Sequence, residues 1–131
     1  MVVGQNYLRV KKYFLLIFFL FFSSLSYSDD YSLTKITKLD EPWGSTFINN
    51  DEIIITEKDG KIKIVNINSK NTFEVKHNLN YLNDGQGGLL DIIYQDKNIW
   101  VSYSEDRGNG KTSTSIARAS LSKKELNFKN I

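Results

Sequence analysis

The chain has 131 residues, of which 40% are hydrophobic and 24% charged, a composition typical of one globular domain and not of a disordered chain. It contains no cysteine, which excludes disulfides, a cysteine-linked lipid anchor and, in practice, a zinc cluster. Three of the 17 basic residues lie in residues 1–28, so the rest of the chain has 14 basic and 15 acidic residues, a charge of −1 that gives no reason to expect a nucleic-acid partner.

Residues 1–28 have the pattern of a secretory signal peptide. A basic region precedes an unbroken apolar run of ten residues, YFLLIFFLFF. Ser26 and Ser28 then supply the small residues that a signal peptidase prefers, which predicts cleavage after Ser28. We therefore expect an exported protein, periplasmic or secreted. The alternative is an uncleaved N-terminal membrane anchor, although a spanning helix needs about 20 apolar residues.

Four short strands are predicted between residues 44 and 76, because β-branched and aromatic runs alternate there with turn residues. The Asp59-Gly60 pair between two such runs is a strong hairpin signal, and KIKIVNI alternates as a half-buried strand does. Tight turns between the runs predict an antiparallel meander. Pro42 is expected to precede the first strand, where it blocks no ladder hydrogen bond. The expected strands are residues 45–49, 52–57, 61–67 and 71–76.

A second set of strands follows the glycine-rich stretch DGQGGLLD (Asp84–Asp91). Its expected members are residues 88–94, 98–104, 112–120 and 125–131. Two successive four-stranded antiparallel units with a period of about 40 residues are typical of β-propeller blades, and an ordinary sandwich of about eight strands is the alternative. A propeller needs at least about four blades, and the chain stops in or just after a strand. We therefore expect residues 29–131 to be the N-terminal, incomplete part of a propeller domain.

Two motifs resemble phosphate-binding loops but lack what such loops require. GNGKTS has the end of a Walker A motif, yet Glu105 replaces its first glycine and no helix is expected to follow. DGQGGLLD lacks the third glycine of a dinucleotide-binding loop, because Leu90 occupies that position. His77 is the only histidine, and we expect it to be solvated in a polar loop, with no partners for a catalytic triad.

The stretch PWGSTFINNDEIIITEKDGKIKIV resembles the opening blade of the glucose/sorbosone dehydrogenase family. GQGGLLDI (Gly85–Ile92) matches the most recognisable early motif of that family, and WVSYSE and SIARASL resemble the strands that follow it. The resemblance runs from Leu39 to Leu121, in order and with suitable spacing, and its specificity comes from four segments agreeing together. The residues of the first stretch that fit the family pattern are Trp43, Thr56, Glu57, Gly60 and Ile62.

The resemblance implies a soluble, periplasmic, six-bladed β-propeller that oxidises the anomeric carbon of aldose sugars to lactones. Such enzymes use pyrroloquinoline quinone (PQQ) and calcium; a histidine is the general base, hydride passes to the PQQ C5 carbonyl, and the electron acceptor here is unknown. The glutamine of the family motif lies in the pocket near substrate and cofactor, a role that carries over to Gln86. A neutral amide that donates and accepts hydrogen bonds suits this role; the alternative for Gln86 is a plain turn residue.

Most of the family's site has no match in these residues. The catalytic histidine, the PQQ-binding arginines and lysine and the calcium-binding backbone are expected beyond Ile131, and His77 does not match the catalytic position. The resemblance therefore implies a fragment that is inactive alone, with Gln86 as its one pocket residue. The alternative is a non-catalytic, exported, β-propeller-like binding protein.

Overall fold

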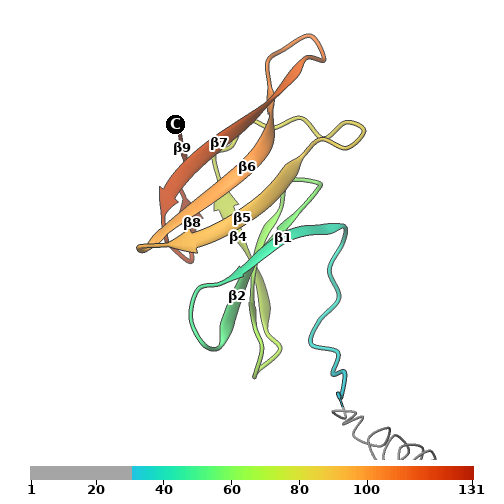
Figure 1. Ribbon diagram of the computed structural model, residues 1–131, viewed down its shortest axis with the longest axis vertical. Helices are drawn as coiled ribbons and strands as arrows, with labels where there is room; N and C mark the ends of the chain where they lie inside the picture. Colours follow the sequence, from blue (N-terminus) through green and yellow to red (C-terminus); the bar gives the residue numbers. More distant parts are fainter. Residues whose placement is uncertain (1–30) are drawn as a thin grey trace, which may run out of the picture. The chain divides into compact units, whose positions relative to one another are not determined.

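The first four strands form the predicted meander. The computed structural model describes residues 31–131; the predicted signal peptide of residues 1–28, its cleavage site after Ser28 and the alternative membrane anchor lie outside the described residues. Residues 35–131 form one compact unit, which contains every strand described here. Antiparallel pairing in chain order (Figure 1) joins β1 (Pro42–Phe47), β2 (Glu52–Glu57), β3 (Ile62–Asn66) and β4 (Thr72–His77).

The N-terminal end of β1 differs from its prediction. Pro42 is the first residue of β1, not a residue before it, and its Cα partner is Glu57 on β2. Proline is tolerated there because β1 is an edge strand with one neighbour, so the missing N–H interrupts no ladder. The predicted strand residues Ile48 and Asn49 form the hairpin connection instead, where the Ile48 N–H donates to the Glu52 carbonyl at 3.0 Å.

The second sheet follows the prediction for three of its strands. Antiparallel pairing joins β5 (Leu89–Gln95), β6 (Asn98–Asp106) and β7 (Thr112–Ser120), and β9 (Lys129–Asn130) pairs with the far edge of β7. The short strand β8 (Glu125–Leu126) belongs to the first sheet, where it runs parallel to β4. The prediction of one strand over residues 125–131 is therefore wrong, because this segment is divided between the two sheets.

The side chain of Asn78 explains this division. Its Oδ1 accepts the Phe128 N–H at 2.7 Å, and its Nδ2 donates to the Phe128 carbonyl at 3.1 Å. Both backbone groups of Phe128 are thereby used between β8 and β9, where they would otherwise continue a ladder. The side chains of Leu126 and Phe128 are buried with the core of the two sheets.

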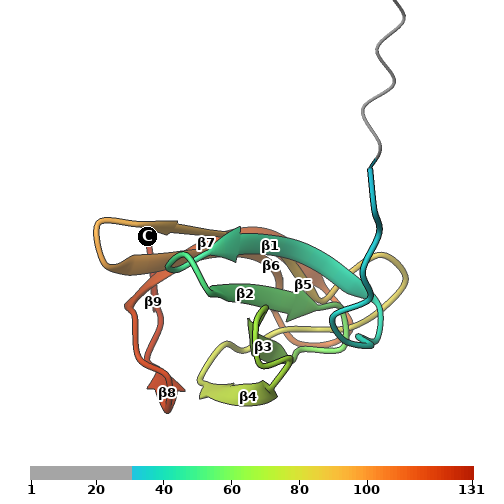
Figure 2. The same ribbon diagram turned by 90° about the horizontal axis from the view of Figure 1, so that it is seen from below.

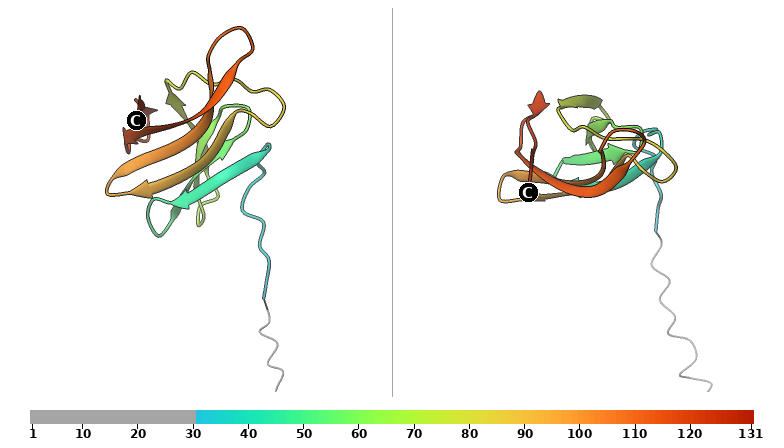
Figure 3. Two further views of the ribbon diagram at one scale, coloured as in Figure 1. Left: turned by 45° about the horizontal axis from the view of Figure 1, so that its top comes forward. Right: turned by 90° about the horizontal axis from the view of Figure 1, so that it is seen from above.

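The core lies between facing sides of the two sheets. Figures 2 and 3 show β1 beside β5 where the sheets meet, and the segment with β8 and β9 on the other side. Since the chain has no cysteine, apolar burial is the main source of stability, at about 1.5–3 kcal/mol for each large side chain. Among residues 31–131, no helix long and apolar enough to span a membrane occurs. The most deeply buried apolar side chains are Ile54, Ile62, Ile64, Val75, Leu89, Ile92, Ile99, Val101, Ala117 and Leu126.

Candidate functional site

The stretch DGQGGLLD begins with a tight turn and ends inside β5. The Gly87 N–H donates to the Asp84 carbonyl at 2.7 Å, which closes a four-residue turn. Gly85 has φ of 55° and Gln86 has a negative φ, the sign pattern of a type II′ turn, whose first central position favours glycine. Gln86 is consequently at the tip of the turn, and its side chain is exposed.

On one side, the connection between β4 and β5 lies against the β2–β3 turn. A Cβ atom at Gly88 (φ 120°) would be 2.0 Å from the Lys58 carbonyl oxygen, so only glycine permits this approach. A Cβ atom at Gly60 (φ 100°) would be 1.9 Å from the ring of Tyr81, whose hydroxyl donates to the Asp59 carbonyl at 2.9 Å. Each segment thus contributes a glycine that makes room for the other.

The prediction that His77 is solvated in a polar loop is wrong, because His77 lies at the end of β4. It is half-buried, and both of its ring nitrogens are used by the backbone. Nδ1 accepts the Leu79 N–H at 3.2 Å, so Nε2 carries the proton and donates to the Gly60 carbonyl at 2.6 Å. Both nitrogens therefore serve the backbone of this region, and the absence of a catalytic role for His77 stays a prediction.

On its other side, the same connection is bonded to the end of β6. The Leu82 N–H donates to the Ser104 carbonyl at 2.9 Å, and the Ser104 N–H donates to the Gly88 carbonyl at 2.8 Å. Asn80 makes a further pair of bonds, accepting the Asp106 N–H at 3.0 Å and donating from Nδ2 to the Asp106 carbonyl at 3.1 Å. The turn that carries Gln86 therefore lies on a connection fixed to both sheets.

A buried hydroxyl on β2 joins β1, β2 and the start of β5. Thr56 Oγ1 donates to the Leu90 carbonyl on β5 at 2.5 Å and accepts the Gly44 N–H on β1 at 3.0 Å. A Cβ atom at Gly44 would lie 2.7 Å from the Cα of Asp91, which shows how closely β1 approaches β5. The role of Thr56 has no signal in the sequence beyond its match to the family pattern, because both partners are distant along the chain.

Glu57 is buried and paired, which makes it a structural carboxylate. Its exposed fraction is 0%, and Oε1 accepts the Asp40 N–H at 2.7 Å. Lys63 Nζ lies 2.9 Å from Oε1 and 2.7 Å from Oε2, although only the Oε1 contact has hydrogen-bond geometry. A carboxylate so enclosed has no path to a substrate, so we assign it to the packing of the first sheet.

Charged groups near the turn are also paired. A hydrogen bond from the Lys61 ammonium lowers the pKa of Asp59, and the same contact raises the pKa of Lys61. Glu105 Oε2 accepts from Ser115 Oγ at 2.5 Å and lies 2.8 Å from Arg107 Nη2. In the part of the chain that the structure describes, no three His, Cys, Asp or Glu side chains form a group that could hold a metal ion.

GNGKTS forms the predicted hairpin loop between β6 and β7. The Arg107 N–H donates to the Lys111 carbonyl at 2.8 Å, and three successive residues, Gly108, Asn109 and Gly110, have φ of 78°, 55° and 70°. Strand β7 follows directly, so the loop lacks the helix N-terminus that a P-loop needs. The exclusion of a nucleotide site by sequence spacing agrees with this geometry.

Two successive antiparallel sheets, joined by this connection and in contact along β1 and β5, are blades of a β-propeller, as predicted. A crystal structure of glucose dehydrogenase has the same fold, with a TM-score of 0.65 and 24% identity over 70% of this chain and 29% of that chain. The family model for glucose/sorbosone dehydrogenase matches residues 39–131. The chain belongs to this family.

The chain spans less than a third of the length of the relatives that it matches. The aldose sugar dehydrogenase YliI of Escherichia coli K12 is 32% identical over 91 residues, which are 65% of this chain and 24% of the relative. The soluble aldose sugar dehydrogenase of Escherichia coli, solved in the apo-form, has a TM-score of 0.63 and 28% identity over 71% of this chain and 29% of that one. The PQQ-bound enzyme of Streptomyces coelicolor, 18% identical with a TM-score of 0.63 over 72% and 30% of the two chains, supports the fold alone.

Proposed function

We propose that this chain is part of a PQQ-dependent dehydrogenase that oxidises the anomeric carbon of aldose sugars to lactones. Family membership supports the reaction class. The observation that carries the proposal is the position of Gln86, whose exposed side chain stands at the tip of a turn bonded to both sheets. A pre-organised amide of this kind can hydrogen-bond a sugar without a charge that must be desolvated.

Within this reaction the role of Gln86 is to bind and orient the sugar. When bound, PQQ would supply the hydride acceptor, and the anomeric hydroxyl would give its proton to a general base as the lactone forms. An amide does not titrate, so Gln86 is not the base. The base, the calcium ligands and most PQQ contacts are proposed to lie in the further blades of a six-bladed propeller, which makes residues 1–131 inactive alone.

We also propose that the protein is exported by residues 1–28 and acts in the periplasm or outside the cell. The basic region, the apolar run and the small residues up to Ser28 support this. N-terminal sequencing of the exported protein tests it, with Asp29 expected as the first residue. Recovery of the intact N-terminus from the membrane fraction would instead favour an uncleaved anchor.

The activity is tested with the complete protein that contains this chain, supplied with PQQ, calcium, an aldose and an electron-accepting dye. We expect dye reduction, and we expect Gln86→Ala to lower kcat/KM by about two- to tenfold, the range for one lost hydrogen bond. Gln95→Ala is the matched control, because this exposed glutamine ends β5 and lies outside the turn; its kcat/KM should not change. A folded holo-protein that binds sugar without reducing dye would overturn the proposal and favour the binding-protein alternative.

A further inference from the structure

We propose that His77 is a positioning residue for Gln86, acting through the carbonyl of Gly60. The inference rests on the proposed function only for its effect on catalysis. Its structural part, that the imidazole fixes the turn at residues 84–87, stands on the contacts of the described chain. His77 touches neither the turn nor Gln86, so its action must pass through the backbone.

The first link is the imidazole itself. One ring nitrogen accepts from Leu79, two residues further along its own connection, and the other donates to Gly60 on the opposite turn. Two aromatic rings lie beside the half-buried imidazole, with ring centroids 6.0 Å away at Tyr81 and 6.4 Å away at Phe128. Two directed hydrogen bonds from opposite sides of the ring restrict its orientation, which is what a positioning group requires.

The second link is the β2–β3 turn, which contacts both ends of the connection. Three successive carbonyls take part: Gly60 accepts from His77, Asp59 accepts from the Tyr81 hydroxyl at 2.9 Å, and Lys58 lies against Gly88. Gln86 lies between these anchor points. Removal of the bond to Gly60 therefore loosens the first anchor, so the bonds of Leu82 and Gly88 to Ser104, which attach the turn to β6, should open more often.

Two substitutions separate the hydrogen bonds of His77. His77→Asn places a carboxamide oxygen near the position of Nδ1 and keeps the bond from Leu79, but loses the donor to Gly60. His77→Gln places an NH₂ group near Nε2 and keeps the bond to Gly60. In the complete holo-protein we expect His77→Asn to lower kcat/KM about fivefold and His77→Gln to recover most of the loss, in line with the modest worth of one hydrogen bond.

A double-mutant cycle shows whether His77 acts through Gln86. If it does, His77→Asn should lower kcat/KM by less than about twofold in a Gln86→Ala background, because coupled residues are not additive. Full additivity of the two losses would overturn positioning through Gln86, since it would show that His77 and Gln86 act independently.

Hydrogen exchange gives a readout that does not require dehydrogenase activity. We expect His77→Asn to raise exchange of the bonded amides of Leu82 and Gly87 about tenfold, while the β6–β7 ladder keeps its protection. Unchanged exchange at both amides would overturn the inference even in an active enzyme, whereas an inactive protein with raised exchange would contradict only the proposed function.

If His77→Asn disturbs folding, a milder variant can be used in the same hydrogen-exchange measurement. Tyr81→Phe removes only the hydroxyl that donates to Asp59, and it should raise the same two exchange rates about threefold. Tyr94→Phe is the matched control, because Tyr94 packs against the core on β5. Equal effects of the two tyrosine variants on these amides would contradict the positioning role of the connection.

Discussion

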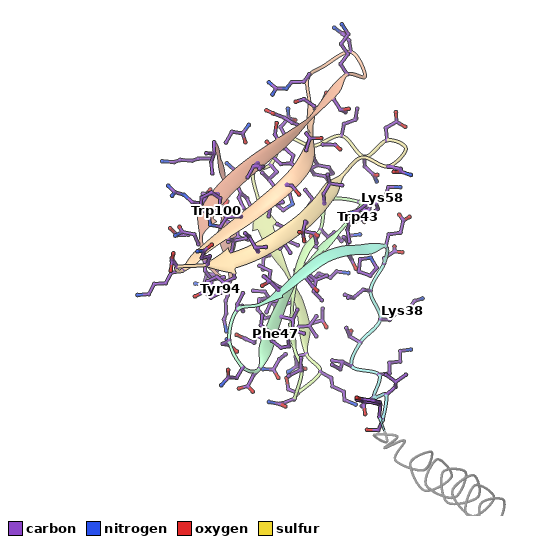
Figure 4. The ribbon with its side chains drawn as sticks, in the orientation of Figure 1. Lys38, Trp43, Phe47, Lys58, Tyr94 and Trp100 are labelled. Carbon is purple, nitrogen blue, oxygen red and sulfur yellow. The ribbon has the colours of Figure 1, made fainter. Side chains whose placement is uncertain are left out.

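The two sheets differ in how many of their faces are covered. On the first sheet, Ile55 and Val65 are buried on the face opposite the shared core, at 8% and 2% exposure. The segment before β1 attaches to the same sheet through Thr37 Oγ1, 3.2 Å from Thr72 Oγ1, and through the Asp40 N–H bond to Glu57. Figure 4 labels Lys38 on this segment. The first sheet therefore has protein against part of its outer face as well as its inner face, whereas Phe47, at the far end of β1 on that outer face, is 57% exposed.

The second sheet has protein on one side only. Its outer face exposes Ile93 at 50% and Ile116 at 52%, with Trp100 beside them (Figure 4) and the Arg118 guanidinium 5.5 Å from the Trp100 ring centroid. Exposed β-branched and aromatic side chains on one sheet face are typical of a surface that another element covers. We therefore expect a further sheet to cover this face of the second blade, because each unit of a repeat architecture packs against its neighbours.

The largest effect is expected where the first sheet is covered. Lys63→Met leaves the buried carboxylate of Glu57 without its cation, which should lower the free energy of unfolding by about 3 kcal/mol, since removal of one partner from a buried pair is strongly destabilising. Urea unfolding of the complete protein measures the loss. Lys61→Met is the control, because its partner Asp59 is partly exposed and water screens the pair. Equal losses in the two variants would contradict the covered-face assignment.

An intermediate effect is expected on the open face of the second sheet. Ile116→Ser should lower the stability of the complete protein by about 2 kcal/mol, the value of one large buried apolar side chain, if a further sheet covers this face. In isolated residues 29–131 the same change should leave stability nearly unchanged and reduce self-association in light scattering. Thr114→Ser, exposed on the same strand, is the control. A neutral result in the complete protein would show that the face stays open.

Local sequence patterns predict most of the strands, whereas contacts between residues far apart in the sequence leave no local pattern. The Asp59-Gly60 turn and the alternation of β3 depend on neighbouring residues, so their positions follow from the sequence. The division of residues 125–131 depends on Asn78, which is 50 residues from Phe128, and no local pattern reports such a bond. The sequence predicts Pro42 before the first strand because a proline inside a strand is unusual. An edge strand, however, permits proline as its first residue, and Pro42 has that position in β1.

The candidate site was predictable only in part, for the same reason. The glycines of DGQGGLLD are compatible with a turn before β5, and the structure has a tight turn at residues 84–87. The pocket role of Gln86 comes from the family resemblance and stays a prediction. A lone histidine in a polar stretch predicts a solvated side chain, but the partner of His77, Gly60, lies on the neighbouring hairpin, 17 residues earlier. The sequence predicts that Thr56 lies in a strand, but no local pattern indicates that its hydroxyl reaches β5.

The smallest effect concerns an ion pair between the two sheets. Lys123, in the segment that leaves the second sheet, places Nζ 2.7 Å from both carboxylate oxygens of Glu52 on β2. This bond, with a second from Asn49, lowers the pKa of Glu52 below its usual 4.5. A lowered carboxyl pKa adds stability above the unfolded value, and the gain disappears as the pH falls through the folded value.

Lys123→Met should therefore cost less than about 1 kcal/mol at pH 7, because Lys123 is half exposed and water screens the pair. The difference from the wild type should shrink as the pH falls below 4.5 and vanish once Glu52 is protonated in both proteins. Unfolding free energies at a series of pH values measure this, with the exposed neighbour Lys124→Met as control. If the unfolding free energies of the wild type and Lys123→Met still differ in acid, Lys123 acts through packing. The ion pair with Glu52 would then not link the two sheets.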